Sequence, residues 1–182
     1  MDKKMKTPKE IIGMVDMNAL MCMKKVLVLK GYRDDGKTST LKELIRQVNE
    51  LYPNTWCMRG KYSAEKYDVK TLVDGVKYGD RSAVFKINGV VVVIHTAGDN
   101  PSAISRTFTI AAKYRAQIVV MALKVNDGEK SRAQIAFEEI RQSVSCEFVE
   151  FDIRGRRLRT FEVESEFAET IVSVISRLVN ER

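Results

Sequence analysis

The residues from Gly31 to Thr38 combine the side chains and glycines that hold phosphate groups. Their sequence, G-Y-R-D-D-G-K-T, fits the pattern G-x-x-x-x-G-K-[ST]. The glycines permit a tight loop whose backbone N–H groups point inward at an anion, and the Lys37 ammonium can reach the outer phosphates of a triphosphate. The Thr38 hydroxyl is a suitable oxygen donor for magnesium. The loop therefore predicts a site for a nucleoside triphosphate and Mg²⁺.

We expect the nucleotide to be bound by this loop and by the first turn of the helix after it. The expected binding residues are Gly31, Asp34, Asp35, Gly36, Lys37, Thr38 and Ser39. Asp34 and Asp35 are unusual in such a loop, because a carboxylate that faces a polyanion weakens its binding unless a cation lies between them. We expect both carboxylates to point outward.

The loop also lies between the two elements that such a site requires. Lys25 to Lys30 is a short run of apolar and β-branched residues, which predicts a strand. Apolar residues then recur at helical spacing from Leu41 to Leu51, and Pro53 stops the predicted helix. Strand, loop and helix in this order are the context in which the pattern is meaningful.

Further strands and helices alternate along the rest of the chain. The pair Asn88-Gly89 predicts a hairpin between an edge strand at residues 83–87 and a buried strand at Val90–Ile94. Later strands are expected at Ile118–Leu123 and Phe148–Ile153, and helices at residues 101–111, 133–140 and 167–178. This alternation predicts an α/β domain of three layers, with a mostly parallel sheet and one antiparallel hairpin.

Two segments have less regular patterns. Asn54 to Ser82 shows no clean periodicity before Val69, Leu72 and Val73, although Thr55 to Met58 could form a strand. We expect this segment to be irregular with at most one short helix. Gly155 is expected to turn the last strand into a hairpin whose second arm holds Leu158 and Phe161. That strand, at Phe148–Ile153, is expected to belong to the core.

These features together make the chain resemble the P-loop NTPase superfamily. The resemblance rests on Val26 to Leu41 and, more weakly, on the alternating elements that follow to about Ile153. The phosphate loop, the N-G hairpin and a strand that runs into T-x-G-D are also similar to uncharacterised single-domain ATP-binding proteins of bacteria and phages. The superfamily implies a parallel sheet, magnesium-dependent nucleotide binding and often phosphate hydrolysis or transfer.

P-loop enzymes usually have an acidic residue at the end of a buried strand, near magnesium. Here the strand at Val90–Ile94 runs into His95-Thr96-Ala97-Gly98-Asp99, which resembles the D-T-A-G stretch of GTPase-like proteins with histidine in place of aspartate. We therefore expect Asp99 to be the acidic residue at the metal, and Lys37 and Asp99 to be the catalytic residues.

Two other interpretations of the same stretch stay open. In one, the site binds nucleotide but hydrolyses it poorly, because a neutral His95 imidazole cannot replace a carboxylate beside hydrated magnesium. In the other, His95 is a satisfied histidine at a strand end and Asp99-Asn100 caps the helix that begins at Pro101.

The identity of the base follows from a missing motif. The N-K-x-D stretch with which GTPases recognise guanine does not occur, and Val125-Asn126-Asp127-Gly128 is not a version of it. We therefore expect ATP rather than GTP.

Arg154, Arg156, Arg157 and Arg159 surround Gly155 at the tip of the predicted last hairpin. Such a cluster can cover a nucleotide, donate an arginine to it or contact the backbone of a nucleic acid or another partner. It can equally be a solvated turn that protects an edge strand.

The favoured function is an ATP-binding P-loop protein with weak or partner-dependent ATPase activity that requires magnesium. One alternative is a small-molecule or nucleotide kinase, with Asn54 to Ser82 as the acceptor pocket and the arginine cluster as its lid. The other is a nucleic-acid or partner-binding module that uses nucleotide as a switch.

Length and composition limit the remaining possibilities. The 182 residues suit one domain, which we place at residues 24–182 after an N-terminal helix or tail at residues 1–23. In that tail, Thr7-Pro8-Lys9-Glu10 reads as a helix capping box. The formal net charge of +7 suits polyanionic partners.

The same composition bears on the compartment. The sequence has no apolar run near the length of about 18 residues that a membrane span needs. It also lacks the features of a signal peptide. We therefore expect a cytoplasmic protein without a membrane partner. Its three cysteines are widely spaced and have no metal-binding pattern, so we expect them to be reduced.

Overall fold

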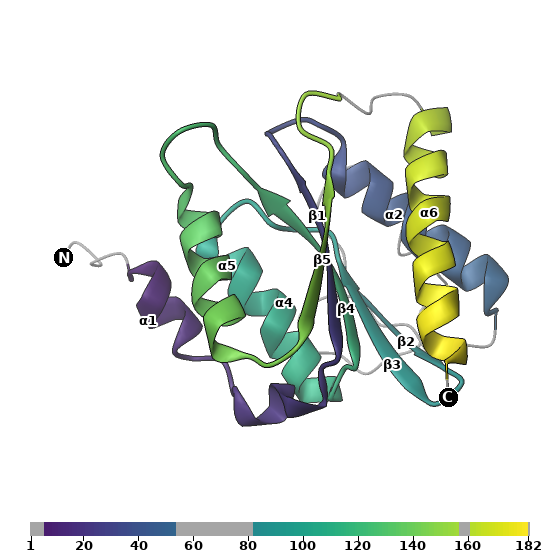
Figure 1. Ribbon diagram of the computed structural model, residues 1–182, viewed down its shortest axis with the longest axis horizontal. Coiled ribbons are helices and arrows are strands. Elements are labelled where there is room, and N and C mark those ends of the chain that lie inside the picture. The colour runs from purple at the N-terminus through teal and green to yellow at the C-terminus, as the bar shows by residue number, and fades with distance from the viewer. Residues whose placement is uncertain (1–5, 54–81, 157–160, 182) are drawn as a thin grey trace.

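The computed structural model describes residues 6–53, 82–156 and 161–181, which form a five-stranded sheet with helices on both faces (Figure 1). The strands are β1 (Lys25–Gly31), β2 (Ser82–Ile87), β3 (Val90–His95), β4 (Ile118–Lys124) and β5 (Glu147–Asp152). The helices are α1 (Pro8–Ile12), the 3₁₀ helix η1 (Asn18–Cys22), α2 (Lys37–Leu51), α4 (Pro101–Tyr114), α5 (Arg132–Ser143) and α6 (Phe161–Asn180).

The strand order is β2-β3-β4-β1-β5. β1 is parallel to both of its neighbours, β4 and β5, and β3 is parallel to β4. β2 is antiparallel to β3. The prediction of a mostly parallel sheet with one antiparallel hairpin is therefore confirmed. The carboxyl ends of β1, β3, β4 and β5 meet at one edge of the sheet, and β4 separates β1 from β3.

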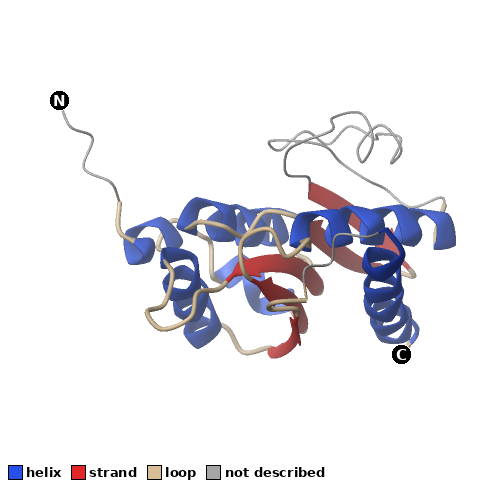
Figure 2. Cartoon of the chain, turned by 90° about the horizontal axis from the view of Figure 1, so that it is seen from above, coloured by secondary structure: helices blue, strands red, loops and turns tan. Residues whose placement is uncertain are grey.

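The sheet buries apolar side chains on both faces because successive residues of a strand point in opposite directions. Val26 and Val28 of β1 belong to one core cluster, which also contains Phe108 of α4. Leu27 and Leu29 belong to a second cluster, with α2 and α6. Accordingly, α1, α4 and α5 cover one face of the sheet, and α2 and α6 cover the other (Figures 1 and 2).

Several local signals act as the sequence predicts. Asn88 and Gly89 have φ values of +50° and +81°, the backbone of a two-residue hairpin turn of type I′. The Asn100 side chain accepts a hydrogen bond from the Ala103 amide and caps α4. Thr7 and Glu10 form the capping box of α1.

Two expectations about the end of the chain are wrong. β5 forms an edge of the described sheet and its residues are half-buried or exposed, so it is not a core strand. Phe161 begins α6 instead of lying in the second arm of a hairpin. Ala168, Ile171 and Ile175 of this segment recur at helical spacing and are buried against the sheet, which favours a helix over a strand.

Some predicted features lie outside the described residues. The segment 54–81 and Leu158 are among them, whereas Ser82 is the first residue of β2. No helix within the described ranges has both the length and the apolar character needed to cross a membrane.

Candidate functional site

The phosphate loop joins the end of β1 to the start of α2. Gly36, the N-cap of α2, has φ +88° in the left-handed region, which glycine adopts at little cost. The first-turn N–H groups of a helix have no partner within the helix, and glycine has no side chain to cap them. The amino end of α2 therefore presents these groups, with the positive end of the helix dipole, to an anion.

Lys37 is held across this loop. Its Nζ donates hydrogen bonds to the carbonyl oxygens of Gly31, at 3.1 Å, and of Tyr32. Burial lowers the pKa of Lys37, and the negative charges of Asp99 and Asp35 oppose that change. Both hydrogen-bond acceptors are neutral carbonyls, so the ammonium is held in place without a direct ion pair to either carboxylate.

The two aspartates of the loop behave differently. The Asp34 side chain is 76% exposed and lies 3.9 Å from Arg33, but it also lines the cavity above the loop, so it does not point away from the site as expected. Asp35 is only 3% exposed, which contradicts the same expectation for this residue. Its Oδ2 accepts hydrogen bonds from the amides of Tyr32, at 2.7 Å, and Gly155, at 3.2 Å.

These two hydrogen bonds explain the burial of Asp35. A buried carboxylate requires donors, and two main-chain amides supply them. Asp35 is thus a structural anchor that ties the phosphate loop to the turn after β5. The sequence interpretation missed this role because Gly155 is far away in the chain.

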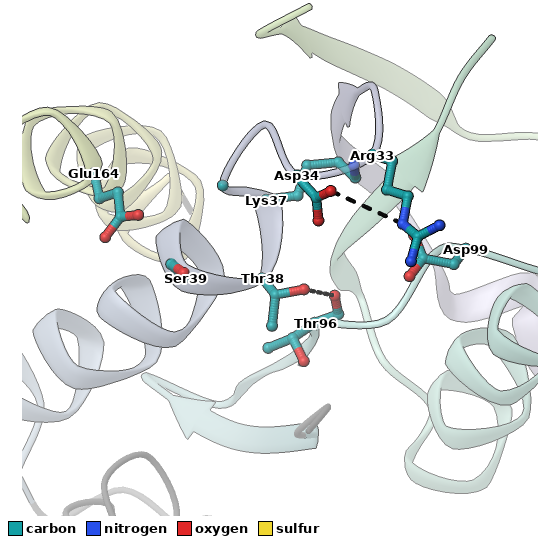
Figure 3. A pocket seen from close by; sticks show the side chains of 9 residues that line it. Arg33, Asp34, Lys37, Thr38, Ser39, Thr96, Asp99 and Glu164 are labelled. Atoms are coloured by element: carbon teal, nitrogen blue, oxygen red, sulfur yellow. Dashed lines mark hydrogen bonds and ion pairs between the residues drawn. The ribbon is translucent and has the colours of Figure 1, made fainter. Parts of the chain in front are cut away.

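A cavity of about 520 Å³ opens above the loop (Figure 3). Its lining consists of Arg33, Asp34, Gly36, Lys37, Thr38, Ser39, Thr96, Asp99 and Glu164. Of the expected nucleotide-binding residues, the cavity thus brings together five, and it adds Asp99 from the β3–α4 connection. Gly31 and Asp35 do not line it.

Gly98 determines the position of Asp99. A Cβ atom at Gly98 would lie 2.0 Å from the carbonyl oxygen of Ala122 in β4. The Gly98 carbonyl also accepts a hydrogen bond from the Lys124 amide, at 2.9 Å. Only glycine allows the chain to pass this close to β4, and the next residue, Asp99, then lines the cavity.

The same connection contacts the phosphate loop directly. Thr38 Oγ1 donates a hydrogen bond to the Thr96 carbonyl, at 3.4 Å (Figure 3). The predicted metal-binding hydroxyl and the end of β3 are therefore side by side, even though β4 lies between β1 and β3 in the sheet.

His95 is buried at the carboxyl end of β3, with 1% of its surface exposed. Its Nδ1 lies 3.2 Å from Ser82 Oγ, whereas Nε2 has no hydrogen-bond partner among the described residues. Burial, helped by the charge of Arg106, lowers the pKa of His95 to about 4. The imidazole is therefore neutral at physiological pH, and it does not line the cavity.

Glu164 of α6 is the cavity residue that sequence reasoning missed. Burial and the nearby charge of Glu43 raise its pKa, and a hydrogen bond with Ser39 opposes the rise. Packing of α6 on α2 brings it there, supported by a 3.1 Å hydrogen bond from Gln47 Nε2 to Ser165 Oγ. The sequence around Glu164 carries no motif, so only the tertiary contact could reveal it.

The arginine cluster is partly described. Arg154 forms an ion pair with Asp152, at 2.7 Å, and the Arg156 guanidinium lies 5.5 Å from the centre of the Phe167 ring. Arg157 and Arg159 lie outside the described residues. The tip of the predicted hairpin is thus a turn at Arg154 and Gly155, shortly after β5.

Within residues 6–53, 82–156 and 161–181, no group of three or more His, Cys, Asp or Glu side chains is arranged to hold a metal ion. Thr38 and Asp99 do line one cavity, where the phosphate oxygens of a nucleotide would supply further ligands. Comparisons with protein-family models, with curated proteins and with solved structures gave no match.

Proposed function

We propose that this chain binds ATP together with Mg²⁺ in the cavity above the phosphate loop. The observation that carries the proposal is the shared cavity lining of Lys37, Thr38 and the glycine-capped amino end of α2. Backbone N–H groups, a helix dipole and an ammonium group are the features that stabilise a triphosphate.

Magnesium is part of the proposal because of the acidic residues around the cavity. Asp34, Asp99 and Glu164 all line it. Three carboxylates beside a triphosphate would repel it, and a divalent cation bound to the phosphates offsets that repulsion. Thr38 and Asp99 would hold the metal. The bound cation would neutralise part of the negative charge of the phosphates.

The reaction that we propose is weak or partner-dependent hydrolysis of the bound nucleotide. A neutral, buried His95 is unable to take the place of a carboxylate at the end of β3. Asp99 is the acid from the β3–α4 connection that lines the cavity, and it would orient water or metal there. Lys37 would stabilise charge on the phosphates.

Titration of a fluorescent ATP analogue, with fluorescence anisotropy as the readout, tests the proposal. The parent protein, Lys37→Ala and a control, Lys86→Ala, are compared in the presence of Mg²⁺. Lys86 is an exposed lysine of β2 and does not line the cavity. We expect Lys37→Ala to weaken binding at least about tenfold, because a charge-assisted contact contributes roughly 1.5–3 kcal/mol.

Lys86→Ala should bind like the parent. Equal affinity of the parent and Lys37→Ala would end the proposal. A companion titration compares ATP and GTP as competitors to test the preference for the base, and ATP is expected to displace the analogue more effectively.

Hydrolysis is tested by measuring the release of phosphate from ATP by the parent and by Asp99→Asn.

A further inference from the structure

A second cavity is lined by Asn100 and Pro101, the two residues that follow Asp99. Its volume is about 670 Å³, larger than that of the cavity above the phosphate loop. Its lining residues come from the N-terminal segment, the β3–α4 connection, α4 and the first residue of α5. The helices α1, α4 and α5 cover one face of the sheet (Figure 1).

Three cationic side chains from separate parts of the chain line this cavity: Lys6, Arg106 and Arg132. No carboxylate is among its described lining residues. Arg132 Nη2 donates a 3.0 Å hydrogen bond to the Lys6 carbonyl, which joins α5 to the N-terminal segment. Three positive charges thus meet at one concave surface.

Among the residues that the structure describes, two of these cations have no carboxylate partner of the kind that other arginines have. Arg141 and Arg154 pair with Glu150 and Asp152, at 3.1 Å and 2.7 Å. No ion pair within the described residues includes Arg106 or Lys6, and Lys6 Nζ contacts only the weak acceptor Met14 Sδ, at 3.3 Å.

The two described carboxylates of the N-terminal segment accept hydrogen bonds from its own backbone. Glu10 Oε2 accepts a hydrogen bond from the Thr7 amide, at 2.7 Å. Asp16 Oδ1 accepts hydrogen bonds from the amides of Asn18 and Ala19. Neither acid lines the cavity, although Glu10 lies near enough to Lys6 for the Lys6 charge to contribute to its lowered pKa. The charge of Arg106 adds to the effect of burial in lowering the pKa of His95.

The rest of the lining combines hydroxyl groups with apolar surface. Ser102, Ser105 and Thr109 recur along one face of α4, and Ser102 and Arg106 are four residues apart, which makes them neighbours on that face. Ile11 and Met14 provide apolar surface opposite them.

We infer that this cavity binds a small anionic molecule with an apolar body, of the phosphomonoester class. Arg106 and Lys6 would pair with the anion, Ser102 would donate a hydrogen bond to it, and Ile11 and Met14 would contact the apolar part. Arginine is suited to this role because its planar group donates two parallel hydrogen bonds to phosphate or carboxylate oxygens.

The site is independent of nucleotide binding but adjacent to it. Asp99 lines the first cavity, and Asn100 and Pro101, the next two residues, line the second. A ligand in the second cavity would therefore contact the segment that positions Asp99.

The test is a titration of the ¹⁵N-labelled full chain with phenyl phosphate, followed by NMR chemical shifts. Benzyl alcohol serves as an uncharged probe of similar shape. We expect phenyl phosphate, but not benzyl alcohol, to shift the amide signals of Ser102, Ser105 and Arg106. Arg106→Met should weaken binding at least about fivefold, because the loss of one charge-assisted partner costs on the order of 1 kcal/mol or more.

Arg177→Met is the matched control, since Arg177 is exposed in the last turn of α6 and lines neither cavity. Arg177→Met should leave the affinity for phenyl phosphate at the second cavity unchanged. Lys37→Ala should also leave it unchanged, so this test is decided separately from nucleotide binding at the phosphate loop. Thermal melts check that each variant is folded. Absence of shifts at α4, equal shifts with benzyl alcohol, or an unchanged affinity of Arg106→Met would each overturn the inference.

Discussion

Asp35 Oδ2 accepts a hydrogen bond from the Gly155 amide, at 3.2 Å, and so joins the phosphate loop to the turn between β5 and α6. The same oxygen accepts a hydrogen bond from the Tyr32 amide, at 2.7 Å. One buried carboxylate therefore fixes two segments that lie far apart in the sequence.

Asp35→Ala should destabilise the protein, because it leaves two amides without their acceptor. We expect a loss of about 2 kcal/mol in the free energy of unfolding. Chemical denaturation measures it. Asp34→Asn is the control: Asp34 is exposed and has φ +63°, a conformation that asparagine tolerates, so its stability should match the parent. Equal stability of Asp35→Ala and the parent would contradict the anchoring role.

His95 should make stability depend on pH. Its pKa is lowered to about 4 in the folded protein, so the unfolded chain takes up a proton at a higher pH than the folded one. The free energy of unfolding therefore decreases as the pH falls through the ordinary pKa of histidine. Between pH 7 and pH 5 the loss from this residue should be about 2 kcal/mol.

Urea denaturation of the parent and His95→Asn at both pH values checks this prediction. His95 is the sole histidine of the chain, so the difference between the two pH dependences isolates its titration. If the free energies of unfolding of the parent and His95→Asn change with pH in the same way, the imidazole is not buried in a neutral form.

Glu164 should make nucleotide affinity depend on pH, if the first cavity is the nucleotide site. Its raised pKa brings protonation closer to neutral pH, and the protonated acid no longer repels phosphate. Affinity for the ATP analogue without Mg²⁺ should increase as the pH falls from 7 to 5. Glu164→Gln should bind the ATP analogue about three- to tenfold more tightly than the parent at pH 7. Its affinity should lack the increase that protonation of Glu164 causes between pH 7 and pH 5.

Glu166→Gln provides the comparison for Glu164→Gln, because Glu166 is a neighbouring acid of α6 that does not line the cavity. It should behave like the parent. Identical pH profiles for the parent and Glu164→Gln would exclude a role of this carboxylate at the bound phosphates.

Gly98→Ala should disturb the β3–α4 connection. The new methyl group would lie 2.0 Å from the Ala122 carbonyl, so the backbone must shift, at a cost of roughly 1–3 kcal/mol or more. Gly13→Ala is the control, since its methyl group meets the nearest atom, the Lys9 carbonyl, at 3.4 Å, and its φ is −59°. The melting temperature, measured by thermal denaturation, should be lower for Gly98→Ala than for the parent and unchanged for Gly13→Ala. An unchanged melting temperature of Gly98→Ala would contradict the close approach of Gly98 to β4.

Local signals in the sequence predicted the local structure well. The Asn88-Gly89 turn, the Asn100 cap and the glycine-bracketed loop each depend on residues within a few positions of one another. Such features follow from backbone preferences and short-range hydrogen bonds, which a single sequence reveals.

Features that depend on distant contacts were missed. Asp35 appeared to be an outward carboxylate because its donor Gly155 is 120 positions away. Glu164 enters the cavity because α6 packs on α2, and no periodicity encodes that contact. Phe161 was assigned to a strand because a glycine turn suggested a hairpin where the chain enters a helix.

The position of β1 between β4 and β5 has a consequence for synthesis on the ribosome. A nascent chain that has emerged as far as Tyr114 contains β1, β2 and β3, yet both hydrogen-bonding neighbours of β1 are still to come. β2 and β3 can pair early as a hairpin, whereas β1 must wait. We therefore expect a chain truncated before Ile118 to leave the strand that carries Gly31 without a place in the sheet.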